Sequence, residues 1–249
     1  MPGQSVHWER VAGWHAVRAL LERQSGRVRA VHLQTGRDDA RAQTILGLAQ
    51  KAGLMVQRID AKLLDKIAAG VSHQGVIAEI EPLKPWSEAD LLEAVAAAPA
   101  PLVLALDGVQ DPHNLGACLR TADACGALAL IVPRDRAAQL NATVRKVAAG
   151  AAETTPVVAV VNLVRCLNLL KKANLWIIGS DAGAAKLAYE TDLSGALVLV
   201  MGAEGEGLRH LTRQTCDLLV RLPQRGTVDS LNVSVATGML LYEALRQRS

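Results

Sequence analysis

Three polar segments hold the residue types that could do chemistry, and each directly follows an apolar run. The first spans residues 107–120, DGVQDPHNLGACLR, and places Asn114 six residues before Arg120. An apolar strand, a polar turn and a helix start form the arrangement in which α/β enzymes bind ligands. A simpler interpretation makes Asn114 the helix N-cap and pairs Arg120 with Asp123.

The second segment is MGAEGEGL, residues 201–208, after the apolar run 196–200. Its glycines, Gly202, Gly205 and Gly207, allow a ligand to approach the backbone closely. Their spacing is not the dinucleotide-binding G-x-G-x-x-G. Glu204 and Glu206 would repel a pyrophosphate, so a neutral or cationic ligand fits better. A plain glycine-rich turn is the alternative.

The third segment is PQRGTVDSLNVSVA, residues 223–236, with Ser230, Asn232 and Ser234 around a helix start. One of these three is expected to be the N-cap, and three polar groups exceed what one cap needs. The helix that follows has no charged residue over 233–242. A helix that is apolar on every face is buried or covered by a partner, and we favour a partner subunit.

The elements that position these segments follow from hydrophobic spacing. Residues 1–80 predict a small α/β domain, with helices at 13–24, 41–52 and 61–69 and strands at 28–33, 54–59 and 75–80. Residues 81–101 are rich in Pro and Ala and predict a linker, in which Ser87 and Asp90 could cap a short helix.

Residues 102–249 alternate strand and helix. Strands are expected at 102–106, 127–132, 157–161, 175–178, 196–200 and 218–222, and helices at 115–125, 141–149, 163–173, 208–216 and 233–246. The strands are continuous apolar runs, as in strands buried on both faces. The fold class is therefore α/β, with an open parallel sheet and helices on both faces.

Composition excludes several classes of protein. The chain has no Phe, four Trp and two Tyr, which disfavours an RNA-binding surface of stacked aromatics. It has no 18-residue apolar stretch and no apolar signal region near its start, so we expect a cytoplasmic protein that contacts no membrane. Four cysteines without a C-x-x-C pair indicate reduced thiols and no metal site.

The net charge of +3 is unevenly distributed. Residues 1–80 hold 11 Lys or Arg and 7 Asp or Glu, whereas residues 81–249 hold 16 and 17. The first third is therefore the better candidate for contact with a polyanion. So small an excess also fits ordinary solvated charge.

Together, the segments NLGACLR, VMGAEGEG and LP…SLNVSVA resemble the three motifs of the SpoU (TrmH) RNA 2′-O-ribose methyltransferases of the SPOUT superfamily. The pieces GWHAV and SHQGVIA extend the resemblance through the first third of the chain. Trp14, where an aliphatic residue is usual, and Asp229, where Ser is common, depart from the pattern.

The resemblance implies an L30e-like RNA-binding domain over 1–80, followed by a catalytic domain over 102–249 with a C-terminal trefoil knot. It implies a homodimer and the cofactor S-adenosylmethionine. The cofactor contacts map onto Met201, Gly202, Leu222, Leu231 and Asn232. The catalytic set maps onto Asn114, Arg120, Glu204, Ser230 and Asn232. RNA docking is expected through Arg10, Arg18, Arg23, Arg27, Arg29 and Arg41.

The implied reaction methylates the ribose 2′-hydroxyl of a guanosine in 23S rRNA, in the peptidyl-site loop of the peptidyl-transferase centre. The substrate would be 23S rRNA or a large-subunit precursor. Either Arg120 loses its proton and acts as the base, or it stays cationic and stabilises the developing alkoxide. We favour the cation, since an ordinary arginine stays protonated. The competing functions are a tRNA ribose methyltransferase, a non-catalytic rRNA assembly factor and a dinucleotide-dependent oxidoreductase.

Overall fold

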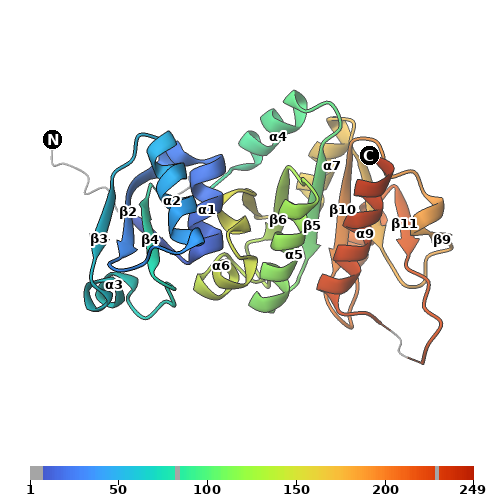
Figure 1. Cartoon of the computed structure of the whole chain (residues 1–249). Helices are drawn as coiled ribbons and strands as arrows, with labels where there is room; N and C mark the ends of the chain where they lie inside the picture. Colours follow the sequence, from blue (N-terminus) through green and yellow to red (C-terminus); the bar gives the residue numbers. More distant parts are fainter. Residues whose placement is uncertain (1–7, 82–84, 228–229) are drawn as a thin grey trace. The chain divides into compact units, whose positions relative to one another are not determined.

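The computed structural model describes residues 8–81, 85–227 and 230–249. These residues form two compact units (Figure 1). The smaller unit comprises the described residues before Pro85 together with Ala149–Thr154, and the larger comprises Pro85–Ala148 and Thr155–Ser249. No helix among the described residues is both long and apolar enough to cross a bilayer.

The smaller unit packs its helices on a four-stranded sheet of order β1-β4-β2-β3. Its elements are β1 (Glu9–Ala12), α1 (Trp14–Arg23), β2 (Val28–Gln34), α2 (Ala40–Lys51), β3 (Val56–Ile59), α3 (Ala61–Ala68) and β4 (Val76–Ile80), with a short 3-10 turn η1 (Ser25–Arg27). The predicted helices and strands are confirmed to within a few residues. β1 was not predicted, because four residues with two charges carry no strand pattern.

The larger unit is built on a seven-stranded sheet of order β7-β6-β5-β10-β8-β11-β9, in which every described pair is parallel. Its strands are β5 (Leu102–Asp107), β6 (Ala129–Pro133), β7 (Val157–Val160), β8 (Trp176–Ser180), β9 (Lys186–Leu187), β10 (Leu197–Gly202) and β11 (Leu218–Arg221). The parallel sheet is confirmed, with β9 as an unpredicted two-residue edge strand. β10 lies between β5 and β8.

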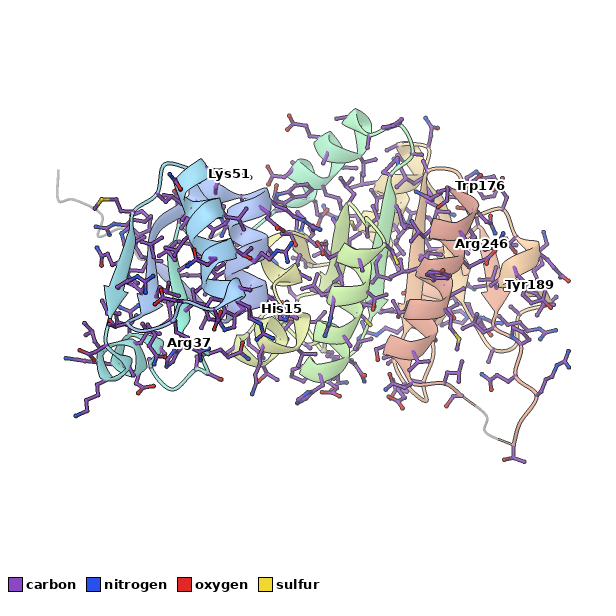
Figure 2. All side chains as sticks on the ribbon, in the orientation of Figure 1. His15, Arg37, Lys51, Trp176, Tyr189 and Arg246 are labelled. Atoms are coloured by element: carbon purple, nitrogen blue, oxygen red, sulfur yellow. The ribbon has the colours of Figure 1, made fainter. Side chains whose placement is uncertain are left out.

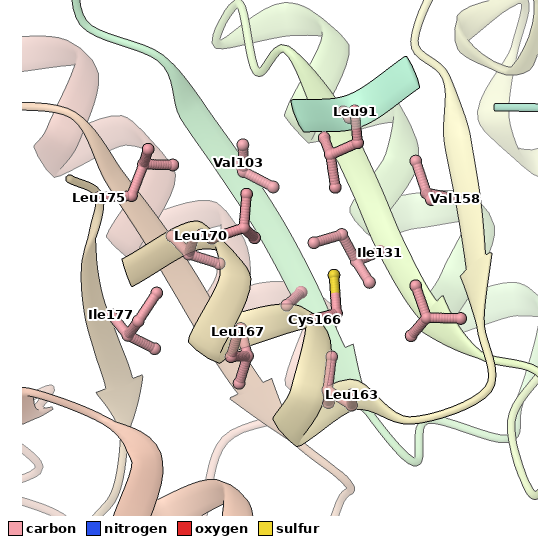
Figure 3. Close-up of a cluster of buried hydrophobic side chains, with 14 of the residues drawn as sticks. Leu91, Val103, Ile131, Val158, Leu163, Cys166, Leu167, Leu170, Leu175 and Ile177 are labelled. Atoms are coloured by element: carbon pink, nitrogen blue, oxygen red, sulfur yellow. The ribbon is translucent and has the colours of Figure 1, made fainter. Parts of the chain in front are cut away.

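Helices cover both faces of this sheet. They are α4 (Glu88–Ala97), α5 (Pro112–Ala124), α6 (Ala142–Ala148), α7 (Leu163–Lys172), α8 (His210–Thr215) and α9 (Val233–Gln247), with a 3-10 turn η3 (Ala188–Glu190). The 3-10 turn η2 (Ala151–Glu153) belongs to the smaller unit. On one face, α4 and α7 bury Leu91, Cys166 and Leu170 against the sheet (Figure 3). On the other face α5 and α9 lie side by side, and the Cys118 thiol lies 3.5 Å from the Thr237 hydroxyl.

The segment that we expected as a linker contains a helix of the larger unit. Ser87 and Asp90 form the predicted capping box at the start of α4. Leu91 and Val95 of α4 are buried in the core of the larger unit. The two compact units divide at Pro85, so residues 88–97 belong structurally with the parallel sheet.

All four cysteines are free thiols, as predicted. Burial among aliphatic side chains raises the pKa of Cys166 to about 12 and that of Cys118 to about 11. Both thiols are therefore protonated and unreactive at neutral pH, which is the behaviour of core residues.

Candidate active site

Helix α5 begins earlier than expected and is capped by a different residue. Asp111 is its N-cap and accepts a hydrogen bond from the backbone N–H of His113, with Pro112 at the first helical position. Proline favours that position because it lacks the N–H that would have no helical partner there. The interpretation of Asn114 as the N-cap is therefore wrong. Asn114 lies in the first turn, where its side chain is available for another contact.

The glycine segment after β10 folds back on its own backbone. Ala203 and Gly207 exchange two backbone hydrogen bonds, of 3.1 and 2.9 Å. A Cβ on Gly202 would lie 2.1 Å from the carbonyl carbon of Gly207. Gly205 and Gly207 have φ angles of +79° and +68°. The turn itself thus requires these glycines, and it presents Glu204 to solvent.

Asn232 joins the three polar segments. As the N-cap of α9, its side-chain oxygen accepts hydrogen bonds from the Ser234 backbone N–H, at 2.9 Å, and from the Ser234 hydroxyl. This fixes the amide orientation, so Nδ2 faces the other two segments. Nδ2 donates to Asn114 Oδ1 at 3.0 Å and to Glu204 Oε2 at 3.3 Å.

A cavity of about 210 Å³ opens beside this junction, at the carboxyl ends of β10, β8 and β11. Four of the predicted cofactor residues line it: Met201, Gly202, Leu222 and Leu231. Glu204 and Ser230 line it too, whereas Asn232 reaches it through its hydrogen bond to Glu204. Apolar Val233 and Ala236 complete the wall at the start of α9.

Sequence reasoning missed one acid of this cavity. Asp181 follows β8 directly and lines the cavity, and its carboxylate accepts a 2.6 Å hydrogen bond from Arg213 Nε. The signal was present, because a polar residue directly after a buried strand marks the ligand edge of a parallel sheet.

Arg120 is exposed on α5. Over the part of the chain that the structure describes, its guanidinium has no hydrogen-bond or ion-pair partner. The suggested pairing with Asp123 is therefore wrong, and Asp123 instead accepts a hydrogen bond from the Thr155 hydroxyl at 3.2 Å. No hydrogen bond or ion pair among the described residues joins the Arg120 side chain to the Asn232 junction, so the guanidinium is available to an external partner.

The arginines predicted to dock RNA differ in their surroundings. Arg27 is held within the smaller unit by the Glu81 carbonyl and by Glu153, whose carboxylate lies 3.5 Å from it. Arg18 pairs with Glu22 at 2.7 Å, and Arg29 lies over the Trp8 ring. Arg10, Arg23 and Arg41 are exposed, and Arg10 donates to the Ile67 carbonyl.

No cluster of three or more His, Cys, Asp or Glu side chains that could hold a metal ion occurs in residues 8–81, 85–227 and 230–249. The departure at Asp229 lies outside these described residues. Trp14 is buried in the core of the smaller unit.

Comparisons with known proteins agree on one family over nearly the whole chain. Residues 101–242 match the SpoU rRNA Methylase family, and residues 10–86 match the RNA 2′-O ribose methyltransferase substrate binding family. The chain is 55% identical over 243 residues to the 23S rRNA (guanosine-2′-O-)-methyltransferase RlmB of Pseudomonas aeruginosa, covering 97% of this chain and 98% of that protein.

Two further comparisons extend this result. The chain is 49% identical to RlmB of Escherichia coli, covering 97% of this chain and 99% of the relative. Its fold is similar to that of the SpoU methyltransferase AviRb from Streptomyces viridochromogenes, whose structure was solved in complex with AdoMet. The TM-score is 0.74 at 23% sequence identity, and the match covers 97% of this chain and 90% of the AviRb chain. The chain belongs to the SpoU rRNA methylase family.

Proposed function

We propose that this protein transfers a methyl group from S-adenosylmethionine to the ribose 2′-hydroxyl of a guanosine in 23S rRNA. The observation that carries this proposal is the junction at Asn232, where three separate polar segments meet beside a cavity. The relatives at 49–55% identity carry the names of enzymes with this activity. We place the target guanosine in the peptidyl-site loop of the peptidyl-transferase centre.

The cavity beside Asn232 fits the cofactor chemically. Met201, Leu222, Leu231 and Val233 offer apolar surface for an adenine ring. Glu204 brings negative charge to the same cavity, beside the Asp181 carboxylate that is paired with Arg213. The Glu204 charge suits a cation and would repel a phosphate. When bound, S-adenosylmethionine supplies an electrophilic methyl group on a sulfonium.

The residues around the cavity hold the nucleophile and its proton. Asn232 orients Glu204 and Asn114 through its two N–H donors. Asn114 in turn presents an amide N–H to the incoming ribose, while Ser230 shapes the reacting pocket. A hydroxyl is a weak nucleophile until its proton starts to leave, so an anion-stabilising group is needed.

Arg120 is our candidate for that group. Its exposed guanidinium has no partner within the described residues, so it is free to grip the RNA phosphate next to the reacting ribose and to stabilise the developing alkoxide. The proton then passes to a phosphate oxygen or to water. Arg120→Ala should abolish methyl transfer and leave cofactor affinity nearly unchanged. Arg120→Lys should recover little, since lysine keeps the charge but not the bidentate fork.

The decisive experiment maps methylated ribose in 23S rRNA by mass spectrometry in a strain that lacks this gene, with and without the gene restored. We expect one guanosine to gain a methyl group on restoration. Methylation found only in tRNA would assign the protein to tRNA modification. Restored ribosome assembly without any methylation would indicate a non-catalytic assembly factor.

We propose that the smaller unit is L30e-like and docks 23S rRNA or its large-subunit precursor. The match of residues 10–86 to a substrate-binding family supports this role. Arg10, Arg23 and Arg41 are exposed and are better placed for RNA than Arg27, whose side chain is only 17% exposed. Arg41→Glu should weaken rRNA binding without changing cofactor affinity, which filter binding and calorimetry would measure.

We propose that the larger unit ends in a trefoil knot. We also propose that the protein acts in the cytoplasm, where ribosomes are made, as a homodimer whose two copies pair through α9. The exposed face of α9 presents Val235, Met239 and Tyr242, which are 48%, 49% and 67% exposed. These three residues form one apolar stripe at helical spacing. Tyr242→Asp should shift the protein from dimer to monomer in sedimentation, whereas Trp176→Asp, at an exposed aromatic on β8 (Figure 2), should not.

A further inference from the structure

A second crevice of about 440 Å³ lies at the carboxyl ends of β5, β6 and β7, within the larger unit. Parallel sheets bind ligands at this edge, and the reaction described above does not use this crevice. Twelve residues from four segments line it, and six of them give it its charge and its exposed apolar surface: Asp107, Arg136, Val161, Arg209, His210 and Leu211.

Exposed basic side chains surround the crevice. Arg136 and His210 are exposed, and neither side chain makes a hydrogen bond or an ion pair with any described residue. Arg209 adds a third basic group, whose side chain is 48% exposed. Among the described lining residues, Asp135 is the one exposed carboxylate. The rim therefore suits an anion.

A buried acid fixes the position of one of these basic side chains. Asp107 is 1% exposed, and its Oδ2 accepts a 2.9 Å hydrogen bond from the Arg209 backbone N–H. Its Oδ1 has no hydrogen bond and lies 3.6 Å from Arg209 Nη1. Gly108 has a φ of +83°, and a Cβ there would lie 3.0 Å from Arg209 Nη2. The Arg209 guanidinium is thus held beside Asp107 and Gly108 in the lining of the crevice, with about half of its side chain exposed.

The walls of the crevice are apolar. Val161 is 68% exposed and Leu211 is 63% exposed, and both side chains line the crevice. Apolar walls beside a cluster of basic side chains match a nucleotide, which has a flat base and an anionic phosphate. In a chain with so few aromatic residues, aliphatic side chains and guanidinium planes are the surfaces available for packing on a base.

The same two segments serve the crevice and the Asn232 junction. The segment from the end of β5 to the first turn of α5 supplies Asp107 to the crevice and Asn114 to the junction. The loop after β10 supplies Arg209 to the crevice and Glu204 to the junction. We propose that the crevice binds a nucleotide of the RNA strand that flanks the methylated guanosine, with Arg136 and His210 on its phosphate and Val161 and Leu211 against its base. This inference rests on the proposed function and names a further contact with the same substrate.

The test compares Arg136→Ala, His210→Ala and Leu211→Ser with Lys172→Ala in the full-length protein. Lys172 is an exposed cation at the far end of α7, so it controls for the loss of one positive charge. The probe is an unmodified 23S rRNA transcript, and its Kd is measured by filter binding at several salt concentrations.

For Arg136→Ala we expect a Kd about tenfold higher and a salt slope shallower by about 0.7 to 1. Leu211→Ser should raise the Kd without changing the salt slope. The KM for RNA should rise while kcat and cofactor affinity stay constant. Lys172→Ala should behave like the wild type.

Two results would overturn the inference: a wild-type Kd and salt slope in both Arg136→Ala and His210→Ala, or an equal loss in Lys172→Ala. Guanosine monophosphate is added as a competitor. If it binds with a micromolar Kd that is lost in Arg136→Ala, the crevice is instead a site for a free nucleotide. If the wild-type protein binds the transcript but does not methylate it, the proposed function is refuted. The inference about the crevice is tested separately, because it depends on RNA binding and not on methylation.

Discussion

Asn232 performs two tasks, and substitutions can separate them. Its oxygen caps α9, while its Nδ2 donates to Asn114 and Glu204. Serine can still accept the hydrogen bond that caps the helix, but it cannot donate in both directions. We therefore expect Asn232→Ser to fold almost as well as the wild type and to lose at least about 100-fold in methyl transfer, since small misplacements of positioning groups have effects of this size.

The magnitudes follow from the geometry. In Asn232→Ala the cap is lost as well, which lowers the free energy of unfolding by about 1 kcal/mol. In Asn232→Asp the cap is kept, but a carboxylate comes about 3.3 Å from Glu204 Oε2. Both side chains are exposed, so water screens the repulsion to about 1.3 kcal/mol. That corresponds to a decrease in Tm of about 2–5 °C for a protein of this size.

The pH dependence of the Asn232→Asp variant identifies the source of its instability. Repulsion raises the pKa of the paired carboxyls in the folded state, so the folded protein binds more protons than the unfolded one as the pH falls. The difference in the free energy of unfolding between Asn232→Asp and the wild type should therefore become smaller as the pH falls from 7 to about 4. Urea unfolding at both pH values, with radiolabelled methyl transfer to rRNA, measures the series. A fully active Asn232→Ser, or an Asn232→Asp deficit that does not change with pH, would refute the reasoning.

Three further predictions use the packing. Gly202→Ala places a Cβ against the backbone of its own loop and should lower the free energy of unfolding by about 3 kcal/mol or more. Gly195→Ala, whose Cβ would lie in open space, should change the free energy of unfolding by less than about 0.5 kcal/mol. Thermal melts of the two variants test this difference. In Gly116→Ala the new Cβ would overlap with Val144 and Val147 of α6, which should lower the free energy of unfolding by about 1–3 kcal/mol. In Gly47→Ala, in the middle of α2, the new Cβ meets no neighbour, and the free energy of unfolding should rise by about 0.5–1 kcal/mol. The Cys166 thiol has its pKa raised by burial from 9.0 to about 12. It should resist iodoacetamide at pH 8 until urea is added, and its contribution to stability should fall as the pH rises from about 9 toward 12, because only the unfolded thiol ionises there.

The sequence predicted the elements well where hydrophobic spacing is long and regular. In the larger unit, the strands of five or more residues (β5, β6, β8 and β10) were predicted because each is an apolar run whose side chains are mostly buried. The two-residue strand β9 and the charged strand β1 have no such pattern. They exist because neighbouring strands offer open edges, which only the folded chain provides.

The candidate site shows a similar limit. Asn114, Glu204 and Asn232 were each found by residue type and by their place after an apolar run. Their meeting could not be predicted from spacing, because it depends on which strands are neighbours in the sheet. The N-cap of α5 was misassigned because Asp111 and Asn114 are both good caps, and Pro112 decides between them by fixing the first helical position.

The position of β10 between β5 and β8 has a consequence for how the protein folds. β10 follows both of these strands in the sequence, yet it forms hydrogen bonds to each of them. The sheet therefore cannot grow by adding strands at its edge in chain order, and a gap between β5 and β8 has to persist until β10 enters it. Such non-local pairing is slow. In refolding experiments, helix content should accordingly recover well before the junction at the carboxyl end of β10 can form, so the reaction site is among the last parts of the molecule to be assembled.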